Sequence, residues 1–309
     1  MRDGAAGIMS SMRNGGSNMN NNIEIHNVTK LYKNNVKGLD NVSFSIGPGV
    51  FGLLGHNGAG KTTLMRAIAT ILKPTSGSIA VMGHDTQKEG DAVRHLTGYL
   101  PQELNMYPEL SVFDFVSYIS ALKGIKDGHE VNRVLEQVGM AEFKKRKIGR
   151  LSGGMKRRTG IAQAIAGHPQ ILIVDEPTAG LDPEERVRFR GILSQFAGEG
   201  KTVLLSTHIV EDVYRICERL AVLRKGKLFY CGSSNELLKQ VAGKIKVLEV
   251  ESETELENLR RKAVVISTVF CHNAIQARIM DENGAFPVMP VPETLEDAYV
   301  YCMGGKSHE

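Results

Sequence analysis

The sequence is poor in three features that would otherwise narrow the search for a function. Its four cysteines, Cys217, Cys231, Cys271 and Cys302, are scattered without paired spacing, which argues against a zinc site or a disulfide framework and suits a reducing cytosol. No stretch approaches the roughly 20 apolar residues that span a bilayer, so any role at a membrane depends on a partner. The net charge is only +4, which gives no argument for binding nucleic acid.

What the sequence does contain is the composition of an ordinary globular protein. It has 309 residues, of which 42% are hydrophobic and 23% are charged, so it can bury a substantial core. This length suits one large domain with an addition, or two domains. Residues 1–22 are rich in Gly, Ser and Asn and have no apolar core, so we expect a disordered leader rather than a signal peptide. Met19 is a candidate for the real start.

Apolar runs separated by helical spacing predict the fold class. Residues 50–54, 171–175 and 202–206 are short apolar runs of the kind that buried parallel strands show. Strand patterns at 23–32 and 41–46 precede them, and the stretch of about 103–170 is mostly helical. Because strands alternate with helices, the sequence predicts an α/β protein with a parallel core.

The C-terminal part follows a different pattern from about residue 236. KVLEVES and AVVISTVF predict strands around a helix, and PETLEDAYVY predicts a short helix that begins after Pro292. We therefore expect a main domain over 23–235 and a small α+β appendix over 236–309.

Residues 55–62, GHNGAGKT, match the phosphate-loop spacing G-x-x-x-x-G-K-[ST]. They follow an expected strand and open an expected helix, which is the context that supports the motif. Glycines let backbone N–H groups point at phosphates, and Lys61 is expected to reach the β- and γ-phosphates while the Thr62 hydroxyl binds Mg²⁺. The residues expected to bind nucleotide are Gly55, His56, Asn57, Gly58, Ala59, Gly60, Lys61, Thr62 and Thr63.

A pair of acids ends the next apolar strand, ILIVDEP at 171–177. Asp175 lies at the carboxyl end of this strand, where α/β sheets place ligands, and is expected to hold Mg²⁺ through water. Glu176 is suited to polarise an attacking water. The plainer interpretation is a surface acidic pair, but an apolar strand that ends in two carboxylates favours a cation or a reaction.

Two polar side chains are weak signals when each is taken alone. His208 follows the TVLLS strand, and a lone histidine is usually structural or exposed; at a strand end beside phosphates it could bind the γ-phosphate or the attacking water. Gln102, in GYLPQ, follows a short strand from which its amide oxygen could reach Mg²⁺ and the water.

The order of six motifs makes the sequence resemble the ATPase subunit of ATP-binding cassette (ABC) proteins. GHNGAGKT, YLPQ, LSGGMKRR (151–158), ILIVDEP, AGLD (179–182) and STH match the Walker A, Q-loop, signature, Walker B, D-loop and switch-histidine motifs over about 23–235. The resemblance implies an ATPase that uses ATP and Mg²⁺. It also implies a P-loop (RecA-like) core, an N-terminal antiparallel β subdomain and a helical subdomain, about 103–170, that carries the signature.

The resemblance also assigns roles to residues. It places Tyr32 where the family has an aromatic that stacks on adenine. The catalytic residues are then Glu176, His208 and Gln102, and those that hold the metal are Thr62, Gln102 and Asp175.

In this family two cassettes pair head to tail, and the signature of one closes on nucleotide in the other. Ser152, Gly153 and Gly154 are therefore expected to bind the partner's ATP, and Asp182 to act at the dimer seam. ATP would favour the closed dimer because it binds both surfaces at once. A single set of motifs implies that the chain forms a homodimer or that it is one half of a pair with a second ABC ATPase subunit.

Three uses of this ATPase remain open from the sequence. The first is an ABC transporter subunit that serves integral membrane permease subunits, with export favoured over import because LSGGMKRR and PETLEDAYVY resemble exporter-type bacterial cassettes. The second is a soluble ABC ATPase in translation or DNA repair, which usually has two cassettes or long insertions. The third is a cytosolic assembly ATPase, such as the iron–sulfur cluster type, against which the appendix counts.

The transporter interpretation predicts a position and a docking surface. We expect the protein in the cytoplasm, peripheral on the inner face of the cell membrane through its permease. Candidate lining residues for the groove that takes the permease helix are Tyr107, Pro108, Phe113, Phe115 and Tyr118, although core packing is the plainer interpretation for most of them.

Overall fold

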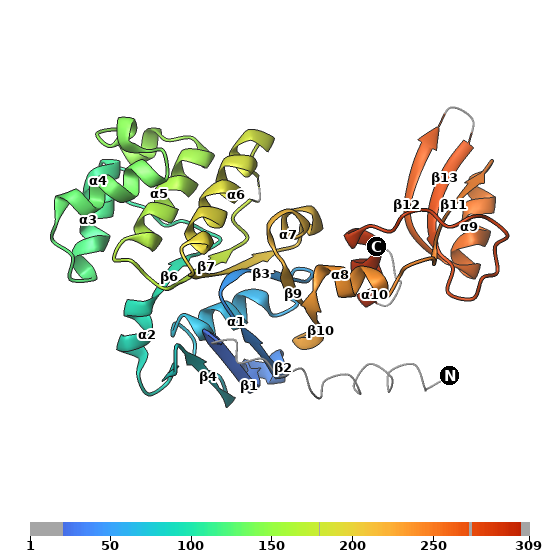
Figure 1. The fold of residues 1–309 in the computed structure, drawn as a ribbon, viewed down its shortest axis with the longest axis horizontal. Helices are drawn as coiled ribbons and strands as arrows, with labels where there is room; N and C mark the ends of the chain where they lie inside the picture. Colours follow the sequence, from blue (N-terminus) through green and yellow to red (C-terminus); the bar gives the residue numbers. More distant parts are fainter. Residues whose placement is uncertain (1–20, 179, 272–273, 304–309) are drawn as a thin grey trace.

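The computed structural model describes residues 21–178, 180–271 and 274–303, folded around three β-sheets (Figure 1). Residues 1–20 of the expected leader, including Met19, and Ala179 of the AGLD motif lie outside the described residues. Asn22, the last residue of the expected leader, is buried and donates a hydrogen bond to Thr202, so the leader ends earlier than expected. The helical layer and the C-terminal sheet lie at opposite ends of the molecule, with the largest sheet between them.

The largest sheet is parallel except at one edge. Its order is β10-β9-β3-β8-β7-β6, and only β10 runs antiparallel, paired with β9 in a hairpin. Every residue of β7 and β8 is buried, as expected for parallel strands covered on both faces. The strands are β3 (Gly49–Leu54), β6 (Thr97–Leu100), β7 (Ile171–Asp175), β8 (Thr202–Thr207), β9 (Arg219–Arg224) and β10 (Lys227–Ser233).

An antiparallel sheet packs beside it and confirms the expected N-terminal β subdomain. Its order is β2-β1-β4-β5, and Ile23 pairs with Ile46 while Ile25 pairs with Phe44. The buried face of this sheet shares a core with helix α1. The elements are β1 (Ile23–Leu31), β2 (Lys37–Ile46), α1 (Lys61–Ile68), β4 (Ser76–Val81) and β5 (His84–Asp85).

Helices cover the other edge of the parallel sheet. Ser111 begins α3 by accepting a hydrogen bond from the Asp114 amide, as a helix cap does. Phe115 lies in the main core, so its expected role in lining a docking groove is wrong: its apolar ring is more stable packed inside. The helices are α2 (Gly90–Leu96), α3 (Val112–Leu122), α4 (Gly128–Gln137), α5 (Gly153–Ile165) and α6 (Pro183–Gly198), with short 3-10 turns at 33–35, 141–143 and 148–150.

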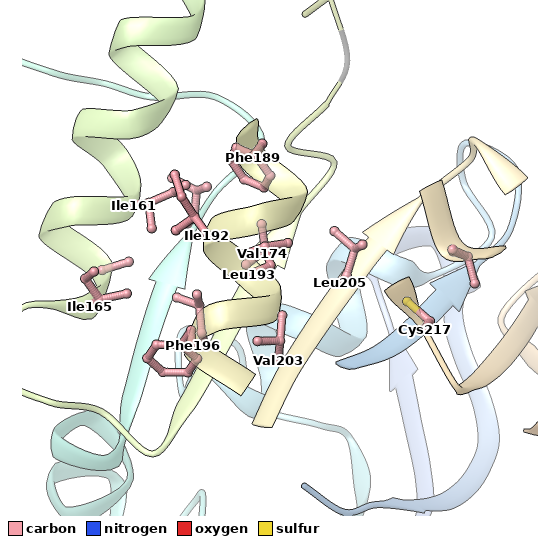
Figure 2. Packing of buried hydrophobic residues seen from close by; sticks show 14 of the residues in the cluster. Ile161, Ile165, Val174, Phe189, Ile192, Leu193, Phe196, Val203, Leu205 and Cys217 are labelled. Carbon is pink, nitrogen blue, oxygen red and sulfur yellow. The ribbon is translucent and has the colours of Figure 1, made fainter. Parts of the chain in front are cut away.

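The main hydrophobic core lies between α5, α6 and the parallel strands (Figure 2). Side chains of α6 point both toward α5 and toward β7 and β8. Residues of this cluster labelled in the figure include Ile161, Ile165, Val174, Phe189, Ile192, Leu193, Phe196, Val203 and Leu205. This packing holds α5 and α6 on the sheet; α5 begins within the signature motif, and the D-loop motif ends at the residue that caps α6.

The C-terminal part forms a three-stranded antiparallel sheet of order β11-β13-β12 with α9 against one face. The sequence pattern showed its outer strands and its helix but not β13, the central strand. The last helix, α10, returns to the main core. The elements are α7 (Val210–Ile216), α8 (Ser234–Lys239), β11 (Ile245–Val250), α9 (Glu253–Lys262), β12 (Val264–Cys271), β13 (Ala274–Met280) and α10 (Leu295–Cys302).

Two expectations about the chain as a whole can be compared with this fold. Within residues 21–178, 180–271 and 274–303, no helix combines the length and apolar character needed to cross a membrane. The four cysteines are free thiols in this structure.

Candidate active site

The phosphate loop connects β3 to α1 and depends on glycine for its shape. Gly58 and Gly60 have φ angles of 79° and 107°, which L side chains rarely adopt. A Cβ atom on Gly60 would also lie 2.5 Å from the backbone oxygen of Gly38. The loop therefore leads into the N-terminus of α1, where the Gly60 position provides no side-chain cap. The end of a helix without such a cap is suited to anions.

Lys61 folds back over this loop with only 4% of its surface exposed. Its Nζ donates to the backbone oxygens of Gly55, at 2.6 Å, and His56, at 3.3 Å. The same ammonium forms an ion pair of 3.1 Å with Glu176 Oε1. A positive charge is thus held at the loop by carbonyl groups and one carboxylate.

Asp175 is fully buried at the end of β7. The Ser206 hydroxyl donates to its Oδ1, whereas its Oδ2 has no hydrogen-bond partner. A buried carboxylate oxygen without a partner is costly. The side chain therefore fits a bound cation, because a cation beside it would satisfy this oxygen.

Glu176 is the residue on which the predicted site converges. Its φ of 44° lies in the left-handed region, which is uncommon for a residue other than glycine. Gln102 Nε2 lies 3.5 Å from its Oε2, and His208 Nδ1 lies 3.2 Å from the same oxygen. The two side chains that were weak signals alone thus meet at one carboxylate, together with Lys61.

The loop that carries Gln102 is supported from the signature helix. Arg157, on α5, donates a hydrogen bond to the Pro101 backbone oxygen at 3.3 Å. Burial lowers the pKa of the Arg157 guanidinium, and nearby Asp175 opposes that shift. In the sequence Arg157 is one residue of the LSGGMKRR motif, and nothing there indicated this contact.

Tyr32 lies beside the phosphate loop, from the N-terminal sheet side. Its hydroxyl is 3.1 Å from the Thr63 hydroxyl, and its ring covers Gly38, where a Cβ atom would lie 2.5 Å from the ring. The side chain is 42% exposed, so its ring is accessible beside the loop.

The signature and D-loop residues form a second cluster. Ser152 caps α5 by accepting from the Met155 amide, and Asp182 caps α6 by accepting from the Glu185 amide. Gly154 packs against Glu185, because a Cβ atom there would lie 2.8 Å from that side chain. Ser152 and Asp182 are exposed, so this cluster faces outward.

A buried contact that the sequence did not reveal joins the two loops that follow β7 and β8. Asp212, on α7 after His208, accepts from the Thr178 hydroxyl at 2.6 Å and from Arg190 at 3.0 Å. Thr178 follows the acid pair, and Arg190 belongs to α6. Acidic residues are common in the first turn of a helix, so nothing in the sequence distinguished Asp212.

Comparison with known proteins agrees with this geometry. The family model described as ABC transporter matches residues 39–179. The linearmycin resistance ATP-binding protein LnrL of Bacillus subtilis (strain 168) is 36% identical over 227 residues, 72% of each chain. The Nod factor export ATP-binding protein I of Burkholderia thailandensis (strain ATCC 700388 / DSM 13276 / CCUG 48851 / CIP 106301 / E264) is 32% identical over 298 residues, 91% of this chain and 97% of that one.

Solved structures show the same fold. A dimeric bacterial ABC transporter cassette, MJ0796, superposes with a TM-score of 0.63 at 27% identity over 68% of this chain and 98% of that chain. The structure of that cassette in a post-hydrolysis state, bound to ADP and Pi, gives 0.62 at 29% identity.

The fold and the site define an ATP-hydrolysing cassette. The chain belongs to the family of ABC transporter ATP-binding proteins. It is an ATPase subunit of the transporter class, and the predicted fold class and family are confirmed. The comparisons do not favour a soluble cytosolic assembly ATPase.

Proposed function

We propose that this chain powers export through separate integral membrane permease subunits, as one half of a homodimer. Relatives named for linearmycin resistance and Nod factor export support the direction of transport. The match to the second relative extends over 91% of this chain, so it includes much of the C-terminal part. The protein would then lie at the cytoplasmic face of the membrane, held by its permease.

The ATP site of this proposal lies within one chain. The loop from Gly55 to Thr63 would hold the phosphates on its amides, and the Tyr32 ring would stack on adenine. Lys61 would exchange its ion pair with Glu176 for the phosphate oxygens, because phosphate carries more negative charge than one carboxylate. That exchange would release the carboxylate for catalysis.

Mg²⁺ fits the residues beside the loop. Thr62, Gln102 and Asp175 would hold it, and the unpartnered Oδ2 of Asp175 is the observation that supports this. When bound, Mg²⁺ neutralises charge on the β- and γ-phosphates.

Glu176 carries the proposed chemistry. Its carboxylate would accept the proton of the attacking water, while His208 and Gln102 would orient the water and the γ-phosphate. The observation that carries this assignment is the meeting of Lys61, Gln102 and His208 at this one carboxylate.

The second cluster would act on the partner's nucleotide. Ser152, Gly153 and Gly154 begin α5, whose first amides would meet the γ-phosphate of ATP bound to the other copy. Asp182 would lie at the seam between the copies. The dimeric structure of MJ0796 supports this arrangement as a precedent for the fold.

The exposed tyrosines of the helical layer are the proposed permease contact. Tyr107 and Tyr118 pack edge to face with ring centroids 6.3 Å apart, and both are exposed. Phe113 borders a nearby cavity of about 510 Å³ together with Lys144 and Lys145. Amphipathic aromatic rings are common at the centres of protein interfaces.

Purification from native cells in mild detergent tests the proposal. We expect an integral membrane protein to accompany the chain, and we expect Tyr107→Asp and Tyr118→Asp to release it while ATP hydrolysis by the purified chain continues. Tyr214→Asp, an exposed tyrosine on α7, is the matched control and should retain the partner. Association with a soluble assembly alone would contradict the transport proposal and leave the ATPase intact.

A further inference from the structure

The last helix of the chain reaches the phosphate loop. The ring of Tyr299, on α10, lies 5.7 Å from the ring of His56 at an interplanar angle of 59°. His56 is the second residue of the phosphate loop. Two segments more than 240 residues apart in the sequence are therefore in direct ring contact.

Tyr299 is held by packing rather than by a polar contact. Only 5% of its surface is exposed, and its buried hydroxyl has no hydrogen-bond partner. Burial raises the pKa of this hydroxyl to about 12. A phenol that costs energy to bury and bonds to nothing suggests that the ring, rather than the hydroxyl, is what this position requires.

The C-terminal sheet holds α10 in place. Arg278, on β13, makes two hydrogen bonds to the buried carboxylate of Asp297, at 2.8 and 2.7 Å. Arg278 also donates to the Pro292 backbone oxygen at 2.7 Å. Thr294 and Asp297 form a capping box that begins the helix. A two-point charged contact fixes direction as well as distance, so α10 cannot rotate freely.

On its other side α10 packs against α7, the helix that follows His208 (Figure 1). A cavity of about 640 Å³ lies between these helices, and its lining includes His56, His208 and Tyr299. The ring contact therefore lies at the edge of the catalytic residues described above.

We propose that Tyr299 is a positioning residue for the phosphate loop, so that the C-terminal sheet sets the protein's affinity for ATP through α10. This inference rests on the ATP site proposed above. Tyr299 restrains the side chain of His56, and this contact holds the loop in the conformation that presents its amides to phosphate. Without the ring the loop has more conformations to lose when nucleotide binds, and affinity falls.

The Tyr299→Leu variant tests this with purified full-length protein. An aromatic pair contributes about 0.5–1.5 kcal/mol, so the KM for Mg·ATP should rise about two- to tenfold, while kcat changes less than about twofold. Tyr299→Phe keeps the ring and removes the unpartnered hydroxyl, and it should restore the wild-type KM. Equal KM values for the Leu variant and the wild type would overturn the proposal, as would a raised KM in the Phe variant.

Tyr301→Leu is the matched control on the same helix. Tyr301 lies under Lys244 and its substitution should leave KM unchanged. An equal rise in KM for Tyr301→Leu would show that any damage to α10 has this effect, and the specific contact would be rejected.

His56→Ala covers the case in which Tyr299→Leu fails to fold, and a double-mutant cycle joins the two variants where both fold. His56→Ala alters a partly exposed loop residue, so it should fold and raise KM by a similar factor. In the pair with Tyr299→Leu the two effects should not add; full additivity would refute the contact. Lys61→Ala distinguishes a failure of this inference from a failure of the proposed ATP site. If both His56→Ala and Lys61→Ala bind ATP normally, the proposed ATP site is rejected. If Lys61→Ala loses ATP binding but His56→Ala binds normally, only the inference about Tyr299 is rejected.

Discussion

The phosphate-loop site and the second cluster, formed by the signature and D-loop residues, differ in burial and in the contacts that their side chains make within one chain. Lys61, Asp175 and Glu176 are buried and contact one another or their neighbours closely. Ser152 and Asp182 are exposed, and among the described residues their side chains accept hydrogen bonds from the amides of the helices that they cap. The first site is thus arranged within one chain, whereas the proposed role of the second depends on another copy of the chain.

The largest expected effect is at the buried site. Glu176→Gln keeps the size of the side chain but removes the base, so kcat should fall by about 10²–10⁴-fold while ATP binding persists. Steady-state ATPase assays together with equilibrium nucleotide titration measure both quantities. Glu211→Gln, an exposed acid on α7 paired with Arg215, is the control. Turnover at the wild-type rate would remove Glu176 from the mechanism.

Binding itself should depend on Lys61. Lys61→Ala removes a charged partner of the phosphates, and losses of this kind cost at least about 2 kcal/mol, so the Kd for ATP should rise by at least about thirtyfold. Titration with a fluorescent ATP analogue measures this. Lys147→Ala, which breaks a surface ion pair with Glu109, should bind as the wild type does. Unchanged affinity for the Lys61 variant would reject the phosphate-loop assignment.

A smaller effect is expected from the buried acid that fits Mg²⁺. Asp175→Asn keeps the shape and removes the charge, so the Mg²⁺ concentration for half-maximal ATPase activity should rise about tenfold or more. Chelation of Mg²⁺ should abolish turnover in the wild type and in Asp175→Asn. Asp91→Asn, an exposed acid on α2, is the comparison variant, and an identical Mg²⁺ dependence in all three proteins would count against this metal site.

The smallest effect on one chain is expected at the signature cluster. Ser152→Arg should leave ATP binding by the monomer unchanged but weaken the ATP-dependent dimer about tenfold, since it places bulk and charge where phosphate must dock. Sedimentation with and without ATP measures this. Ser111→Arg removes the equivalent cap from α3 and controls for the lost helix cap.

Mixing variants sharpens the same comparison. A dimer of Ser152→Arg with Lys61→Ala contains one composite site in which both loops are intact, so the mixture should regain ATPase activity that neither variant has alone. A mixture as inactive as its components would show that the two clusters do not meet across copies.

Much of the fold could be predicted because its signals are local. The runs at 171–175 and 202–206 are apolar throughout, which favours buried parallel strands, and Ser111 with Asp114 marks the start of α3. The strand β13 could not be predicted in the same way. Its sequence, AIQARIM, places Gln276 and Arg278 among apolar residues, and they are accommodated by Glu249 and Asp297 from distant segments.

In the candidate site, too, the residues with a local sequence signal could be predicted and those that depend on distant contacts could not. The spacing of GHNGAGKT and the acids after ILIVD were sufficient to nominate Lys61, Asp175 and Glu176. Nothing local indicated that Gln102 and His208 meet at one carboxylate, because β6, β7 and β8 first have to align their carboxyl ends. The role proposed for Tyr299 could not be predicted from the sequence, since its partner His56 lies at a variable position of the phosphate-loop motif.

The contact of Asp212 with both Thr178 and Arg190 has a mechanical consequence. It ties α6 and α7 together at a buried point, immediately after the two loops that carry Asp182 and His208. The two loops are therefore linked by hydrogen bonds as well as by the backbone. A displacement of either loop has to carry the Asp212 contact with it or break these buried hydrogen bonds, which is costly.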